Sequence, residues 1–113
     1  MIKLEIFKSD NPKKKYKAIF SKDDGKTKTI HFGANGYEDY TQHHDKKRRD
    51  LYRNRHEKDL KGDPMRAGYL SYYILWGEST SLQANIREFK KNLNIFNLRI
   101  YIYKYVGRTD QKL

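Results

Sequence analysis

The chain begins with a pattern in which hydrophobic and charged residues alternate. MIKLEIF places an aliphatic residue at every second position from Ile2, and a period of two is typical of a half-buried β-strand. YKAIF and TKTIHF have strand-forming compositions and are separated by Asp24-Gly25, a turn signal. Residues 1 to about 32 are therefore predicted to form a three-stranded antiparallel meander.

A basic helix is predicted after a loop. Two glycines follow the last predicted strand and can adopt positive φ, so the segment up to Asp45 is interpreted as an ordered loop. Asp45 is a favourable N-cap, and the residues from Lys46 to about Leu60 are strong helix formers without Gly or Pro. Arg48, Tyr52 and His56 are four residues apart, so they lie on one face of this helix.

Two further helices are predicted beyond it. Asp63-Pro64 combines an N-cap with a proline at the first helical position. The following MRAGYLSYYILW is apolar on nearly every side, so we expect the central buried helix there, ended by Gly77. Thr80 and Gln83 have the capping-box spacing that begins a third helix. The core-facing stripe of that helix comprises Leu82, Ile86, Phe89 and Leu93.

Period-two alternation returns near the C-terminus. IFNLRIYIYKYV is predicted to form a strand over about residues 95–106, with an aliphatic face for the core. We expect this strand to pair back into the N-terminal meander. Its opposite face would carry Arg99, Tyr101, Tyr103 and Tyr105.

These elements predict one α+β domain over residues 1–113: an N-terminal three-stranded antiparallel meander, three helices and a C-terminal strand. The longest apolar stretch, residues 67–76, is about half the ~20 residues that span a bilayer, and the first residues lack a signal-peptide pattern. We therefore expect a soluble protein with no membrane partner.

Charge gives the first indication of function. The chain has 25 Lys and Arg against 14 Asp and Glu, a formal net charge of +11, and such a surplus attracts polyanions. Cations with nearby rings suit nucleic acid, although pairs such as Arg53 with Glu57 leave a solvated face as an equally weighted alternative for the basic helix. The candidate nucleic-acid-binding residues are Lys13, Lys14, Lys15, Lys46, Lys47, Arg48, Arg49, Arg53 and Arg99.

Catalytic chemistry finds little support in the sequence. No cysteine is present, which excludes disulfide scaffolds, iron–sulfur sites and thiol nucleophiles. There is no nucleophile elbow, phosphate-binding loop or glycine-rich dinucleotide turn. His43, His44 and Asp45 could ligate a divalent ion, but they match no recognised metal-site spacing. We expect no metal, no cofactor and no enzymatic activity.

Polar residues of the loop and the basic helix form a second candidate group, comprising Asp39, His43, Asp45, Arg55 and His56. They could form a buried hydrogen-bond cluster that locks the loop to the helix, or a ligand site. We favour the structural cluster, because buried polar groups usually satisfy one another.

Three roles are open for the tyrosines of the predicted C-terminal strand. They could lie under a helix, form a homodimer surface or provide a stacking platform for single-stranded nucleic acid. Because a long aromatic strand edge in a small domain needs covering, we predict a twofold homodimer through Tyr101, Tyr103 and Tyr105.

The central block, residues 30 to 77, carries a series of motifs. It contains a strand ending H-F-G, then G-Y-x-D-Y-T, x-H-x-D, Y-x-x-R-H, D-P-x-x-A-G-x-L-S and I-L-W. In this combined spacing the chain resembles a family of small basic proteins encoded by large nucleocytoplasmic DNA viruses of protists, including marseillevirus-like giant viruses. The matching positions include His31, Gly33, Tyr37, Asp39, Thr41, His43, Asp45, Tyr52, Arg55, His56, Asp63, Pro64, Gly68, Ser71 and Trp76.

The resemblance implies a virion-associated viral protein with no established enzymatic activity, present in the particle and, after entry, in the host cytoplasm or nucleus. Many relatives in this family end soon after the third helix. The predicted C-terminal strand is therefore a departure from the family, and it would add a sheet edge and an oligomer interface.

Three functional hypotheses follow. The first is a non-enzymatic basic protein that binds DNA or RNA, with DNA favoured, mainly through phosphates, and that helps package or protect the genome or assists early infection. The alternative is a protein-interaction module that docks on acidic host or virion proteins. The third is a metal-dependent enzyme built on His43, His44 and Asp45.

Overall fold

A three-stranded sheet forms the N-terminal part of the molecule. The computed structural model describes residues 2–60 and 64–101. Its first three elements are β1 (Lys3–Lys8), β2 (Lys14–Ser21) and β3 (Thr27–Ala34). The strands are antiparallel in the order β1-β2-β3, so the predicted meander is confirmed.

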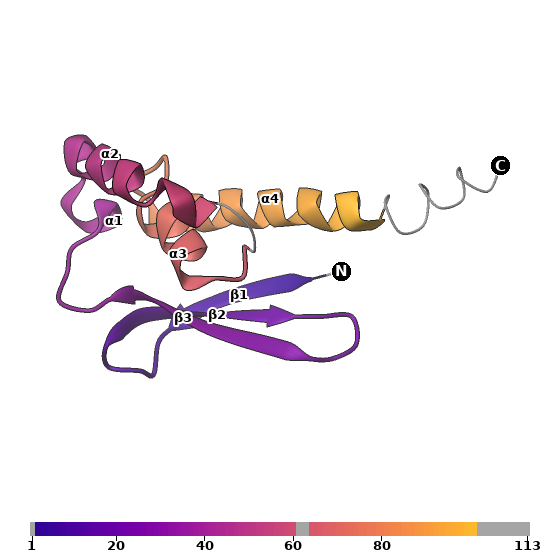
Figure 1. The fold of residues 1–113 in the computed structure, drawn as a ribbon. Helices are drawn as coiled ribbons and strands as arrows, with labels where there is room; N and C mark the ends of the chain where they lie inside the picture. Colours follow the sequence, from indigo (N-terminus) through magenta and orange to yellow (C-terminus); the bar gives the residue numbers. More distant parts are fainter. Residues whose placement is uncertain (1, 61–63, 102–113) are drawn as a thin grey trace.

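Helices cover one face of this sheet. Within the described residues, the helical elements are α1 (Tyr40–His43), α2 (Lys46–Arg55), the 3-10 turn η1 (Glu57–Leu60), α3 (Ala67–Leu70), the π-helical turn η2 (Ser71–Leu75) and α4 (Leu82–Tyr101). Figure 1 shows α1 to α4 on the same side of the three strands. The fold therefore belongs to the α+β class, as the sequence predicts.

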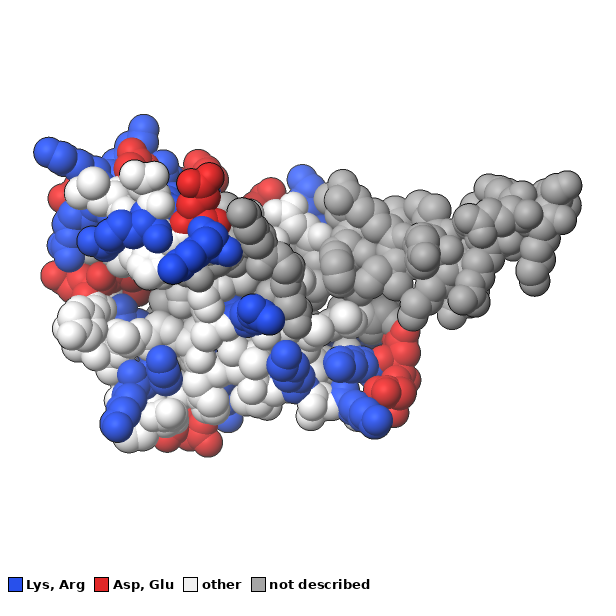
Figure 2. Space-filling view, viewed as in Figure 1, with Lys and Arg blue, Asp and Glu red and all other residues white. Residues whose placement is uncertain are grey.

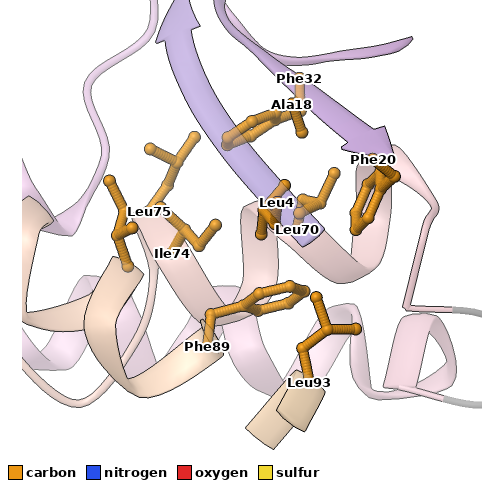
Figure 3. Packing of buried hydrophobic residues seen from close by; sticks show 10 residues of the cluster. Leu4, Ala18, Phe20, Phe32, Leu70, Ile74, Leu75, Phe89 and Leu93 are labelled. Carbon is orange, nitrogen blue, oxygen red and sulfur yellow. The ribbon is translucent and has the colours of Figure 1, made fainter. Parts of the chain in front are cut away.

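The core lies where the sheet meets α3, η2 and α4 (Figure 3). Phe20 and Phe32 from the sheet are fully buried, as are Leu70, Ile74 and Leu75 from α3 and η2. Burial of one such side chain contributes about 1.5–3 kcal/mol. The predicted central helix is confirmed as the buried one. On α4, the predicted stripe is confirmed by the burial of Ile86, Phe89 and Leu93.

A buried amide holds the turn between η2 and α4. Asn85 donates to the carbonyl oxygens of Ile74 at 2.9 Å and Ser79 at 2.8 Å, and its Oδ1 accepts from the Ser79 N–H at 3.1 Å. Gly77 lies beside this amide, and a Cβ there would be 2.2 Å from the carbonyl oxygen of Tyr73. The helical run ends before Gly77, as predicted, and only glycine fits the close approach of the backbone.

One turn of helix interrupts the segment that the sequence predicts as a loop. Asp39 and Gln42 form a capping box, in which the Asp39 carboxylate accepts from the Thr41 N–H at 2.9 Å and Gln42 Oε1 accepts from the Asp39 N–H at 3.0 Å. These bonds satisfy N–H groups that a helix start leaves without partners. The interpretation of the whole segment as a loop is therefore wrong.

The basic helix α2 begins where predicted and ends early. The Asp45 carboxylate accepts from the N–H groups of Lys47 at 3.0 Å and Arg48 at 3.3 Å, which confirms the N-cap. The α-helix ends at Arg55 instead of continuing to Leu60, and the chain goes on as η1.

The next two helices begin later than predicted. Pro64 lies in a turn, and α3 begins at Ala67, with the predicted cap at residue 63 outside the described residues. The cap of α4 is Ser81 and not Thr80, because Ser81 Oγ accepts from the Ala84 N–H at 3.2 Å.

The predicted C-terminal strand is wrong over residues 95–101, because these residues belong to α4. Residues 102–106 lie outside the described residues. The sequence of this segment fits both the period of a strand and the period of a helix. Apolar residues alternate in IFNLRIYI, yet they also recur at helical intervals of four and three. That second series runs through Leu82, Ile86, Phe89, Leu93, Phe96 and Ile100.

Gly33 provides a test of how the sheet meets η2. Gly33 has φ +80°, and a Cβ there would lie 2.8 Å from Cδ1 of the buried Leu75. Gly25 has φ +82° with nothing within 4 Å of the same position. In both Ala variants the left-handed backbone conformation lowers the free energy of unfolding by about 1–2 kcal/mol. We expect Gly33→Ala to lose about 1–3 kcal/mol more than Gly25→Ala in urea unfolding, because its methyl group overpacks the core. Equal losses would contradict this packing.

Candidate functional site

Two arginines of α2 are engaged inside the molecule. Arg53 Nη1 lies 3.0 Å from Oε1 of Glu78, and its guanidinium lies 4.6 Å from the centroid of the Tyr72 ring. Arg49 lies 5.3 Å from the Tyr40 centroid and reaches Glu78 at 3.6 Å. Burial opposes the charge of Arg53, yet hydrogen bonds to Tyr72 and Glu78 raise its pKa. Both arginines are predicted phosphate ligands, and both already have partners within the protein.

Lys15 is a third predicted phosphate ligand with an internal partner. Its Nζ lies 2.7 Å from Oδ2 of Asp39, with only 11% and 4% of the two side chains exposed. Nζ also donates to Oε1 of Gln42 at 2.7 Å. Lys15 therefore joins β2 to the capping box of α1, and its charge is neutralised by a carboxylate.

The remaining described candidates of the predicted phosphate-binding set stay near the surface. Lys13, Lys46, Lys47 and Arg48 are exposed, and Lys14 is half-buried at the start of β2. Within the described residues, none of these five side chains forms an ion pair. Figure 2 shows Lys and Arg side chains over α2 and over the sheet, with fewer Asp and Glu side chains between them.

A neutral histidine joins α1 to α2. Nδ1 of His43 accepts a hydrogen bond from the N–H of Asp45 at 2.9 Å, so in this arrangement the ring proton sits on Nε2. That Nε2 atom is buried without a hydrogen-bond partner among the described residues. The ring lies 5.3 Å from the Trp76 ring and 6.2 Å from the Tyr40 ring, measured between centroids.

An open groove of about 430 Å³ lies between the ends of β2 and β3, the loop before α1, the helix α2 and the helical run α3–η2. Arg48, Tyr52 and His56 all line it, in agreement with their predicted placement on one helix face. The groove also gathers side chains from the sheet. Its cations are Lys14, Lys15, Arg48 and Arg55, and its carboxylates are Glu38 and Asp39.

Aromatic rings form one wall of the groove. Tyr52 stacks on Trp76 with a centroid distance of 4.2 Å and an angle of 7°. Its ring also stacks on His56 at 4.2 Å and 25°. Tyr37, in the loop before α1, lines the groove and is 76% exposed. The groove therefore combines stacked rings, an exposed ring and cationic side chains.

The predicted polar cluster is divided in the structure. Asp39, Arg55 and His56 line the groove, whereas His43 and Asp45 bond to each other at the α1–α2 junction. This bond joins the last residue of α1 to the N-cap of α2. Arg55 and His56 lie at the other end of α2, so the five residues do not make one compact cluster.

The predicted Tyr face lies in a segment of which the structure describes only the backbone up to residue 101. Arg99 and Tyr101 belong to α4, and their side chains lie outside the described part of the structure. Tyr103 and Tyr105 lie outside the described residues altogether. Because residues 95–101 are helical, they provide no strand edge for the predicted homodimer.

Sequence reasoning missed several residues of the groove. Trp76 and Ser71 lie in the segment predicted as the central buried helix, and Tyr37 lies in the predicted loop. A usable signal existed for Tyr37, since a large aromatic residue between Gly36 and Glu38 has few apolar neighbours to bury it. No local pattern connects these three segments, because the fold alone brings them together.

Residues 2–60 and 64–101 contain neither a metal-binding cluster nor a membrane-spanning helix. No three His, Asp or Glu side chains in these ranges are arranged to hold a metal ion. No helix in these ranges is long and apolar enough to cross a membrane.

Comparison with known proteins gives one partial match. Residues 4–56 match the model of a family of unknown function (DUF5754), a segment that runs from β1 to the end of α2. It covers slightly less than half of the chain. No curated protein and no solved structure matches the chain. The similarity therefore spans part of the groove and assigns no activity to it.

The half-buried His43, whose Nε2 atom is buried, predicts a pH dependence of stability. Burial and the nearby Arg48 lower the pKa of His43, although Asp45, Glu38 and Asp39 act in the opposite direction. Below pH 6.5, which is about the pKa of an unfolded histidine, the unfolded chain therefore binds more protons than the folded one. The free energy of unfolding then decreases as the pH is lowered. We expect this loss to be smaller in His43→Asn, whose amide oxygen can still accept from the Asp45 N–H.

The measurement is urea unfolding of the wild type and the variant at about pH 7.5 and about pH 5.5, on either side of the unfolded histidine value. Between the higher and the lower pH, the free energy of unfolding should decrease more for the wild type than for the variant. An unchanged difference would contradict the assignment of a depressed pKa to His43.

Proposed function

We propose that this protein is a non-enzymatic basic protein that binds nucleic acid, with DNA favoured over RNA, mainly through its phosphates. The observation that carries the proposal is the outward display of Lys46, Lys47 and Arg48 at the start of α2. The two carboxylates of the same segment are already engaged, because Asp45 caps the helix and Asp50 binds Arg49 at 3.0 Å. The cations are therefore available to an external anion.

The charge of the sheet supports the same proposal. Residues 1–34 contain nine Lys and only four Asp and Glu. The field of this region therefore adds to that of α2 instead of cancelling it, and both contribute to the attraction of a polyanion. Phosphate contacts of this kind position a protein on nucleic acid without reading its sequence. We accordingly propose binding that is independent of base sequence.

The biological setting rests on the family resemblance alone. It supports a role in a virus particle, in genome packaging or in early infection, with later presence in the host cytoplasm or nucleus. Homodimer formation also stays a prediction. The protein-interaction module stays the alternative hypothesis. Among the described residues, the exposed large hydrophobic side chains are Phe7 on β1, Tyr37 in the loop before α1 and Leu51 on α2.

Charge removal on α2 tests the proposal. In Lys46→Gln/Lys47→Gln/Arg48→Gln the slope of log affinity against log salt for duplex DNA should decrease by about 1 for each lost phosphate contact, about 3 in all. The loss should be the same for duplexes of unrelated sequence. Arg49 is left unchanged, because its replacement would also remove the contacts to Glu78 and Tyr40.

The matched control is Lys3→Gln/Lys22→Gln/Lys26→Gln, which removes the same charge from exposed positions outside α2. Fluorescence anisotropy with labelled duplexes over a salt series measures both variants. The control should retain most of the wild-type slope. Equal effects of the two triple variants would contradict a contact surface on α2, and a wild-type slope near zero would contradict phosphate binding.

A further inference from the structure

The groove beside α2 has a composition that phosphate contacts alone do not explain. Its volume of about 430 Å³ falls in the range of small-ligand sites, about 300–1,000 Å³. A flat cationic surface would be sufficient to bind a duplex backbone. A groove with aromatic walls therefore indicates a ligand that has a planar group able to enter the groove.

Five of the residues that line the groove are small. Gly33 and Ala34 come from β3, and Ala67, Gly68 and Ser71 come from α3 and η2. At Gly33 the sheet comes close to the helices, because a Cβ there would lie 2.8 Å from Cδ1 of Leu75. Ala34, Ala67, Gly68 and Ser71 present little side-chain bulk to a planar group in the groove.

The charge of the groove favours an anion. Lys15 and Asp39 neutralise each other across 2.7 Å. Of the other charged residues that line the groove, Lys14, Arg48 and Arg55 are cationic and Glu38 is acidic. Arg48 and Arg55 are exposed, and neither forms an ion pair within the described residues. The groove therefore has a net positive charge, with guanidinium groups suited to bidentate contact with a phosphate.

Aromatic rings of the groove offer surfaces on which a base can stack. The Trp76–Tyr52–His56 stack lines the groove, so its aromatic atoms offer a wall for a planar ligand. Tyr37 is 76% exposed at the groove, where its ring can stack on a base. Rings beside cations are the combination that proteins use to bind unstacked bases of single strands.

We propose that this groove binds one unpaired nucleotide of a single-stranded nucleic acid, with the base against Tyr37 and the aromatic wall and the phosphate on Arg48 and Arg55. This inference rests on the proposed nucleic-acid binding and specifies which form of nucleic acid the groove selects. Bases within a duplex are stacked and paired, so they cannot enter the groove without being extruded.

Tyr37→Ala is the main test variant, and Phe7→Ala is its matched control. Phe7 is an aromatic residue on β1, 45% exposed and not part of the groove lining. The probes are a labelled oligothymidine and a duplex with the same number of phosphates. Tyr37→Ala should weaken oligothymidine binding by on the order of ten- to a hundredfold, the effect of losing one stacked base. Its duplex affinity and its salt slope should stay close to those of the wild type.

Two further measurements make the test independent of one substitution. Ala34→Leu narrows the groove without changing its charge, at a position that is exposed, and it should also weaken oligothymidine binding selectively. Trp76 is the single tryptophan and lines the groove. Its fluorescence should change when oligothymidine binds and stay unchanged with the duplex. Thermal melting of each variant confirms that it is folded.

The outcomes separate this inference from the proposed function. If the wild type binds both probes with a steep salt dependence and Tyr37→Ala binds oligothymidine as well as Phe7→Ala does, the groove inference is wrong and phosphate binding stands. If the wild type binds neither probe, both are wrong. Selective loss of oligothymidine binding in Tyr37→Ala and Ala34→Leu supports both.

Discussion

The ion pair between Lys15 and Asp39 connects the two halves of the molecule. Lys15 belongs to β2, and Asp39 is the N-cap of α1, so their contact at 2.7 Å ties the sheet to the helical layer. The Asp39 side chain is almost completely buried, and it also accepts a hydrogen bond from the Thr41 N–H. Removal of either partner would leave a buried charge without compensation, which is strongly unfavourable. The position of α1, and through the short His43–Asp45 connection that of α2, depends on this pair.

This constraint divides the cations into two classes with different roles. Lys15, Arg49 and Arg53 stabilise the fold through Asp39, Asp50, Glu78 and the rings of Tyr40 and Tyr72. Lys46, Lys47, Arg48 and Arg55 are exposed and point to the solvent or the groove. A net charge of +11 does not make this distinction. The proposed function depends on the second class alone, and this is why substitutions of the two classes should have different consequences.

The sequence predicts the elements whose signals are local. The alternation in MIKLEIF, the Asp24-Gly25 turn, the N-cap Asp45 and the apolar helix ended by Gly77 all appear in the structure. The C-terminal prediction fails because two periods coincide there. Phe96 and Ile100 fit an alternating strand, and they also continue the helical stripe that starts at Leu82. Periodicity alone cannot decide between the two in such a segment.

The candidate site is less predictable, because it is made by contacts between distant segments. Lys15 and Asp39 are 24 residues apart in sequence, and nothing near Lys15 indicates that its charge is neutralised. The groove combines β2, β3, the loop at Tyr37, α2 and η2. The sequence did place Arg48, Tyr52 and His56 on one face. It could not indicate that Trp76 lies against that face, since the stacking of Tyr52 on Trp76 depends on the tertiary fold.

A residue-resolved map of where nucleic acid binds tests the proposed contact surface directly. Backbone amide spectra of ¹⁵N-labelled protein, recorded while an oligothymidine is added, provide such a map. We expect the largest shifts at Lys46 to Arg48, at Tyr52 to His56 and near Tyr37, with little change at Ile19 on β2. Shifts concentrated on the sheet away from α2, or an absence of shifts at low salt, would contradict the proposed contact surface.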